Sequence, residues 1–124
     1  HQFNVFCVNN TIQYGLAKYL NLDLDWSAIS SSYAKRKDLF INAIGTSRFK
    51  ILPCEGTYFC LLDYTAISNE SDIEFTERLV KEFGIALIPI SVFYADKTDN
   101  KLVRVCFAKD DEMLLKGAEK LCKI

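Results

Sequence analysis

The sequence predicts an α+β domain in which helices cover a small, mainly antiparallel sheet. The chain has 124 residues, the usual size of one domain, and 50% of them are hydrophobic, so it can bury one core. Apolar residues recur at helical spacing near both ends, whereas short apolar runs typical of strands occupy the middle. The expected order is helix, helix, strands, helix, strand, strand, helix, which is not the regular alternation of a parallel sheet.

Two helices are expected in the first third of the chain. The first begins near Thr11 and ends near Asn21, and residues 21–25 connect it to a second helix that starts at Trp26. We expect Gly45 to end the second helix in the left-handed conformation, and we assign the charged residues 35–38 to its solvated face. The apolar face expected for the second helix is made of Trp26, Ile29, Tyr33, Phe40, Ile41 and Ile44.

Two strands joined by a turn are expected next. They cover residues 49–52 and 57–64, and residues 53–56, with Pro53 and Gly56, supply the turn. The run at residues 58–62 is apolar throughout, which predicts that this strand is buried on both faces.

A capping-box pattern, Ser-Asp-Ile-Glu at residues 71–74, marks the start of a third helix. The Ser71 hydroxyl is placed to accept from the third backbone N–H of the helix, and Glu74 is placed to reach back. We expect Gly84 to close this helix. Its apolar stripe comprises Phe75, Leu79, Val80 and Phe83.

The last third of the chain contains a short apolar segment at residues 85–90, a loop at 91–100 and a strand at 101–107. Three carboxylates at residues 110–112 then mark the start of a final helix, where the helix dipole favours negative charge. The buried face expected for this helix is made of Leu114, Leu115, Ala118 and Leu121.

The composition argues against several classes of function. Fifteen basic and 16 acidic side chains leave a net charge of −1, so we expect no nucleic-acid partner. No apolar stretch reaches the roughly 18–20 residues that span a bilayer, so we expect no membrane partner. The only histidine is His1, which argues against a metal site and against a nucleophile activated by histidine. Five cysteines without a Cys-x-x-Cys pair predict reduced, buried thiols in a cytoplasmic protein.

Arg104 is the most informative candidate for a binding residue. In a strand it shares one face with Leu102 and Cys106, and valines flank it in the chain. Because an unpaired buried charge is costly, Arg104 must lie on a solvated face, pair with a carboxylate such as Asp63, or face a cavity that receives an anion. The pattern favours the first two alternatives, although the planar guanidinium suits a carboxylate bound through two parallel hydrogen bonds.

Three segments carry a resemblance to a known family. They read GTYFCLLDYTAIS at residues 56–68, IALIPISVFY at residues 85–94 and KLVRVCFAKDDEMLLKGAEKL at residues 101–121. In this order and with similar gaps, they resemble the C-terminal part of class I/II aminotransferases that use pyridoxal phosphate, especially the methionine and kynurenine aminotransferase-like branch. The opening HQFNVFCVNNTIQYGLAKYL is similar to the stretch that links the large and small domains of that family.

The resemblance implies a fold and a set of site residues. The fold is the small domain of fold type I, with residues 1–25 as a linking segment and helix and residues 26–124 as the core. Arg104 matches the family's arginine that binds the α-carboxylate of the amino-acid substrate. Phe6 lies in a region that approaches the substrate pocket of the neighbouring subunit, and some members have histidine in place of Cys7. Residues 91–94, and Tyr94 in particular, lie near the entrance to the site and contribute to side-chain specificity.

The resemblance also implies what lies elsewhere in such an enzyme. The cofactor-binding lysine of the family belongs to a large domain upstream, and none of the eleven lysines of this chain has a matching context. A cofactor enzyme relies on the protein to orient and tune its cofactor, and most of that apparatus is upstream in this family. We therefore expect pyridoxal phosphate in the full-length enzyme, but no catalytic or cofactor-binding residue in this chain.

Taken together, the expected protein is the C-terminal part of a cytoplasmic, homodimeric aminotransferase that moves an amino group between an amino acid and a 2-oxo acid. The first residue, His1, is consistent with a cut inside a longer chain, and we expect this part to be inactive without its own large domain. The alternative is a stand-alone α+β module that uses Arg104 to hold a small anion without catalysis. The amino donor and acceptor cannot be named from the residues present.

Overall fold

The computed structural model describes residue 4 and residues 7–124, so the prediction made for Phe6 lies outside the described residues. The chain forms two compact units, His1–Ser30 and Ser31–Ile124. In the first unit, helix α1 (Asn10–Leu20) begins where the Asn9 side chain accepts a hydrogen bond from the backbone N–H of Ile12. This helix agrees with the sequence prediction, and none of its residues is buried.

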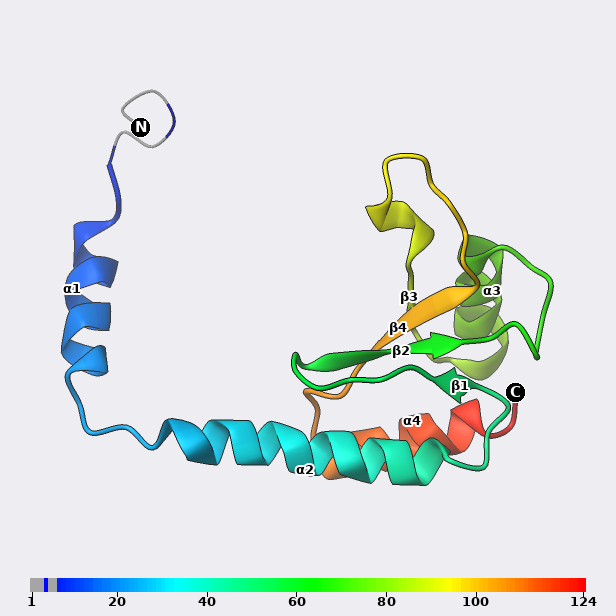
Figure 1. Cartoon of the computed structure of the whole chain (residues 1–124), viewed down its shortest axis with the longest axis horizontal. Coiled ribbons are helices and arrows are strands. Elements are labelled where there is room, and N and C mark those ends of the chain that lie inside the picture. The colour runs from blue at the N-terminus through cyan, green and yellow to red at the C-terminus, as the bar shows by residue number, and fades with distance from the viewer. Residues whose placement is uncertain (1–3, 5–6) are drawn as a thin grey trace. The chain divides into compact units, whose positions relative to one another are not determined.

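The second unit contains a four-stranded sheet with strand order β1-β2-β4-β3, in which every neighbouring pair is antiparallel (Figure 1). The strands are β1 (Lys50–Ile51), β2 (Phe59–Asp63), β3 (Ile88–Pro89) and β4 (Leu102–Cys106). The predicted α+β class and the small antiparallel sheet are therefore confirmed. The strands are shorter than the apolar runs predicted for them, because the pairing between β2 and β4 ends at Asp63 opposite Leu102.

Helices supply the other layer of this unit. Helices α2 (Trp26–Ile44) and α4 (Asp111–Leu121) contribute buried residues to the same core as α3 (Asp72–Arg78). The strand residues in that core, Cys60, Leu62, Val103 and Val105, all occupy the alternate positions that share one face of the sheet. The helices therefore cover one face of the sheet, and the opposite face is only partly buried.

This one-sided packing corrects the prediction that residues 58–62 are buried on both faces. Only Cys60 and Leu62 are buried, whereas Phe59 and Leu61 are partly exposed and Tyr58 is exposed. A continuous apolar run looks the same in a strand that is covered on both faces and in a strand whose second face is apolar but partly exposed. Within the second unit, the α-helices leave that second face uncovered.

Helix α2 has the predicted bounds but a smaller buried face. Phe40 and Ile44 are buried, Ile41 is partly exposed, and Trp26, Ile29 and Tyr33 are exposed, because only the last turns of α2 reach the core. The expected left-handed end at Gly45 is also wrong, since Gly84 alone among the described glycines has a positive φ. The chain leaves α2 through short-range bonds instead, with the N–H of Ser47 donating to the carbonyl of Ile44 at 2.9 Å.

The third predicted helix is confirmed at both ends. Ser71 and Glu74 form both bonds of the capping box, and Gly84 ends the helix at φ 60°. Its last part, Leu79–Phe83, is a π-helical turn, which holds more residues per turn than an α-helix. The predicted apolar stripe is therefore interrupted after Leu79, and Val80 is exposed.

The last helix, α4, has most of the buried face that was predicted for it. In α4, Leu114, Ala118 and Leu121 are buried as predicted, whereas Leu115 is exposed, since it lies on the side turned away from the core.

All five cysteines are free thiols, but only Cys60 is buried, and burial raises the pKa of its thiol to about 12. Cys7 and Cys122 are exposed, so the prediction of burial fails for them. None of the described helices is both long and apolar enough to cross a membrane.

Candidate functional site

Arg104 lies at the centre of the partly exposed face of the sheet. It occupies the middle of β4, opposite Leu61 of β2 on one side and Ile88 of β3 on the other. Its neighbours Val103 and Val105 are buried in the core, so the alternation of a strand directs Arg104 to the opposite face. The sequence prediction that Leu102, Arg104 and Cys106 share a face is confirmed by this burial pattern.

Aromatic rings surround the guanidinium of Arg104. Its central carbon, Cζ, lies 4.3 Å from the ring centre of Phe59 and 5.9 Å from those of Tyr58 and Phe93. A guanidinium within about 6 Å of a ring face is attracted by the negative face of the ring. These contacts limit where the side chain can go, so the charged group is held in a defined place before any ligand arrives.

The side chain of Arg104 has a hydrogen-bond donor that no described protein group satisfies. Its Nε is buried and has no hydrogen-bond partner among the described residues. Within residue 4 and residues 7–124, no acidic side chain forms an ion pair with Arg104. A buried donor without a partner is costly, and an anion at this position would supply the missing acceptor.

Asp63 is not the partner that the sequence suggested. Its carboxylate accepts from the backbone N–H of Thr65 at 2.8 Å and from the hydroxyl of the same residue. These bonds hold the pKa of Asp63 below its usual range, with a smaller contribution from Lys50. The ion pair between Asp63 and Arg104 therefore does not form, because a local turn at the end of β2 uses the carboxylate.

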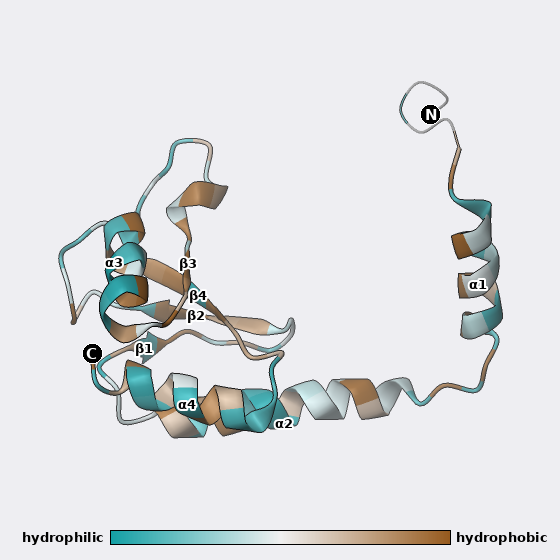
Figure 2. Ribbon diagram, turned by 180° about the vertical axis from the view of Figure 1, so that it is seen from behind, coloured by the Kyte–Doolittle hydropathy of each residue, from teal (hydrophilic) through white to brown (hydrophobic). Residues whose placement is uncertain are grey.

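The loop that follows β3 brings a further ring to the site. Residues Ser91–Phe93 form a 3₁₀-helix, and Phe93 at its end reaches the guanidinium. Figure 2 shows this short helix coloured as hydrophobic, although Val92 and Phe93 are both exposed. Tyr94, which we predicted to lie near the site entrance, is also exposed, and its ring is not among those in contact with Arg104.

The sequence analysis missed Tyr58 and Phe59 as neighbours of Arg104, and it brought Phe93 near the site only through the resemblance, as one of residues 91–94. Phe59 could have been found from the alternation of its strand, because it occupies the same sheet face as Leu61, the partner of Arg104. The interpretation of that strand as buried on both faces concealed this signal. Phe93 leaves no such signal, since its approach depends on the path of the loop.

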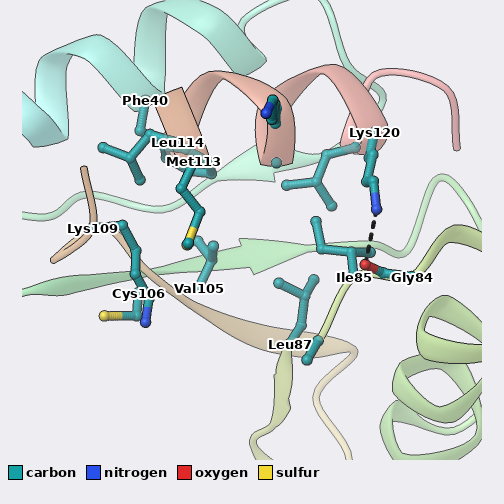
Figure 3. Close-up of a pocket in the computed structure, with 14 residues that line it drawn as sticks. Phe40, Gly84, Ile85, Leu87, Val105, Cys106, Lys109, Met113, Leu114 and Lys120 are labelled. Carbon is teal, nitrogen blue, oxygen red and sulfur yellow. Dashed lines mark hydrogen bonds between the residues drawn. The ribbon is translucent and has the colours of Figure 1, made fainter. Parts of the chain in front are cut away.

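A separate pocket lies on the side of the sheet that the helices cover. It has a volume of about 330 Å³ and is bounded by β4, α4 and residues 84–87 (Figure 3). Its walls are mainly apolar, and the Nζ of Lys120 at its rim donates to the carbonyl of Gly84 at 3.0 Å. Arg104 does not line this pocket. The described residues also contain no cluster of three histidine, cysteine or carboxylate side chains that could hold a metal ion.

Comparison with known proteins identifies the class to which this fold belongs. Residues 3–121 match the family described as aminotransferase class I and II, so the chain belongs to that family. This result confirms the resemblance found in the sequence.

Individual relatives agree with this class. A methionine aminotransferase of Escherichia coli is 46% identical over 98% of this chain, and a kynurenine–oxoglutarate transaminase of Dictyostelium discoideum is 26% identical over the whole of it. The solved structure of E. coli YbdL, described as having a methionine aminotransferase function, superposes with a TM-score of 0.90 at 45% identity over the whole of this chain and 33% of its own. That of N-succinyldiaminopimelate aminotransferase from Mycobacterium tuberculosis gives 0.84 at 28% identity, over 98% of this chain and 32% of its own. The chain spans only 32% of the length of the E. coli methionine aminotransferase and 34% of that of the Dictyostelium transaminase.

The family implies pyridoxal phosphate, and the residues around Arg104 do not fit this cofactor as its holder. An aldehyde cofactor held covalently needs a primary amine, and neither Arg104 nor the three rings around it carries one. The unpartnered Nε within a planar fork instead fits a carboxylate. We therefore assign no step of cofactor chemistry to these residues.

Proposed function

We propose that this chain is the small domain of a longer pyridoxal-phosphate-dependent aminotransferase and that Arg104 binds the α-carboxylate of its amino-acid substrate. Residues 26–124 would form the domain core, and residues 1–25 would link it to a large domain. The observation that carries this proposal is the buried Nε of Arg104, which has a defined place among aromatic rings but no acceptor among the described residues.

The wider setting follows from the same proposal. A full-length, homodimeric and cytoplasmic enzyme would exchange an amino group between an amino acid and a 2-oxo acid, and its large domain would supply the cofactor-binding lysine. The relatives, a methionine aminotransferase and a kynurenine–oxoglutarate transaminase, support this class of substrate. The open face of the sheet around Arg104 would then be covered by the rest of the enzyme, which would raise the strength of a bidentate bond to carboxylate by excluding water.

Arg104→Ala in the full-length protein tests the role of the guanidinium. We expect KM to rise and kcat/KM to fall by about 10- to 150-fold, which corresponds to the ~1.5–3 kcal/mol of a hydrogen bond to a charged group. Arg104→Lys keeps the charge but loses the fork, so it should recover only part of the activity. Arg36→Ala is the matched control, because among the described residues the side chain of Arg36 donates only to the hydroxyl of Ser32 on its own helix. Kinetics that match this control would show that Arg104 is not a substrate ligand.

The 124-residue chain by itself provides a second test. Added pyridoxal phosphate, followed by borohydride reduction, should leave no stoichiometric adduct at any single lysine, and the chain should have no aminotransferase activity. A specific, reducible adduct at one lysine would contradict the division of roles proposed here. Binding of a small anion that depends on Arg104, in a full-length protein without aminotransferase activity, would instead favour the stand-alone module.

A further inference from the structure

We propose that Asp72 is a positioning residue for this site, acting through Ser91 to hold Phe93 beside Arg104. The proposal rests on the proposed function, since it assigns a role to the surroundings of the carboxylate-binding arginine. It names a contact between α3 and the loop after β3, which lie 19 residues apart in the chain.

The carboxylate of Asp72 is buried, and both of its oxygens accept hydrogen bonds from Ser91. Asp72 is the first residue of α3 and is 1% exposed, and Ser91 is 4% exposed. The Oδ2 atom of Asp72 accepts from the backbone N–H of Ser91 at 2.6 Å, and Oδ1 accepts from the Ser91 hydroxyl at 2.7 Å. A buried carboxylate is costly unless its oxygens are hydrogen-bonded, so this pair has a strong preference for one geometry.

This pair fixes the start of the short helix that carries Phe93. Ser91 is the first residue of the 3₁₀-helix Ser91–Phe93. The other backbone bonds of this turn are local, from the N–H of Phe93 to Ile90 and from the N–H of Tyr94 to Ser91. Its side chains after Ser91 are exposed, so packing against the core contributes little to its position. The bonds to Asp72 therefore fix the first residue of this turn, while the buried Ile90 and the pairing of β3 with β4 hold the chain that enters it.

The position of the turn matters because Phe93 is one of the rings at the guanidinium. The Phe93 ring centre lies 5.9 Å from Cζ of Arg104, yet Phe93 itself is 62% exposed. An exposed ring keeps a fixed place only if its backbone is held. Loss of the Asp72–Ser91 pair should therefore release Phe93, widen the space around the guanidinium and weaken the fit of a substrate carboxylate.

The first experiment observes Arg104 directly in the 124-residue chain. The ¹H–¹⁵N resonance of Arg104 Nε is sensitive to the ring currents of Phe59 and Phe93, and it can be assigned with Arg104→Lys. We expect Asp72→Ala, Ser91→Ala and Phe93→Leu all to shift this resonance. Ser71→Ala is the matched control, because it weakens the cap of the same helix without touching Ser91. If Asp72→Ala and Ser91→Ala leave the resonance where Ser71→Ala leaves it, the proposal is wrong.

Asp72→Asn separates positioning from general loss of structure. An asparagine can accept from the Ser91 N–H through its oxygen and donate to the Ser91 hydroxyl through its amide, so it should keep the resonance near its wild-type position. This variant also keeps the proposal falsifiable if Asp72→Ala fails to fold, as judged by circular dichroism. A shift in Asp72→Asn as large as that in Phe93→Leu would overturn the proposal.

Kinetics of the full-length protein form the second arm, with L-methionine as amino donor. We expect Asp72→Ala and Ser91→Ala to raise KM about fivefold, the equivalent of one net hydrogen bond, with a smaller effect on kcat and recovery in Asp72→Asn. An unchanged KM in these variants, when Arg104→Ala raises it, would refute the positioning role alone. An unchanged KM in Arg104→Ala would refute the proposed function, and the resonance of Arg104 would still report on the contact itself.

Discussion

Replacing Phe75 by alanine tests the core that supports the proposed site. Phe75 lies on the buried side of α3 and is fully buried. Its ring stacks on that of Tyr64 at a centre-to-centre distance of 4.1 Å and an angle of 8°, and it meets Phe49 at 6.2 Å and 57°. The guanidinium of Arg78 lies 5.4 Å above the same ring. One side chain thus joins α3 to the segments that flank β1 and follow β2.

The magnitude follows from these contacts. A buried Phe→Ala substitution costs about 3–5 kcal/mol in unfolding free energy, because it removes apolar contacts and leaves a cavity. Aromatic pairs add about 0.5–1.5 kcal/mol beyond burial, so we expect the upper half of that range for Phe75→Ala. Domains of this size are stable by about 5–15 kcal/mol, so the variant should lose roughly a quarter or more of the total. Phe75→Leu keeps most of the volume and should cost about 1–2 kcal/mol through lost aromatic pairing.

Urea unfolding of the 124-residue chain, followed by circular dichroism, measures these losses. The midpoint should fall in the order wild type, Phe75→Leu, Phe75→Ala, with an unchanged slope if the transition stays two-state. Ile73→Ala is the matched control, since Ile73 lies on the same helix but is exposed. It should change the stability by about 0.5 kcal/mol or less. A Phe75→Ala midpoint no lower than that of Ile73→Ala would refute this account of the core.

Two further predictions concern stability. Gly84→Ala should lower the unfolding free energy measured in urea by about 1–2 kcal/mol, because Gly84 has a φ of 60°. Gly117→Ala is the control: Gly117 lies inside α4 with nothing within 4 Å of a new Cβ, so this variant should be more stable by up to ~1 kcal/mol. A Gly84→Ala variant as stable as the wild type would contradict this reasoning. Glu70 accepts from Arg78 at 2.8–3.0 Å and also from Ser68, which holds the pKa of its carboxyl below the ordinary value. The pKa of Glu70 is lower in the folded than in the unfolded chain, so its ion pair stabilises the fold above about pH 4.3, and this stabilisation is lost on further acidification. Its size is on the order of 1 kcal/mol or less, because the two side chains are about one-third exposed. Unfolding free energies measured across this range should therefore fall more steeply in the wild type than in Glu70→Gln, and equal slopes would count against it.

Features that depend on neighbours within a few residues were predictable. The capping box of Ser71 and Glu74 needs only the spacing of two side chains across one helical turn. The outward direction of Arg104 follows from the alternation of a strand and from the valines beside it. The left-handed conformation was assigned correctly at Gly84 but wrongly at Gly45, because a glycine after a helix permits that conformation without requiring it.

Burial was predicted less well where it depends on a second layer. Periodicity marks a residue as apolar, but exposure of Trp26, Ile29 and Leu115 depends on how far the core extends beneath each helix. Likewise, the run at residues 58–62 is apolar on both faces, and only the positions of the helices decide which face joins the core.

The sequence by itself determined the class of the fold, the family and the choice of Arg104, because these rest on local periodicity and on motifs that are contiguous in the chain. Only the tertiary structure decided what surrounds Arg104. Phe59 lies 45 residues before it, and Phe93 reaches it from a turn whose first residue, Ser91, is hydrogen-bonded to the buried carboxylate of Asp72. Such contacts depend on strand register and loop path, which are set by the packing of the whole core and leave no periodic signal in the chain.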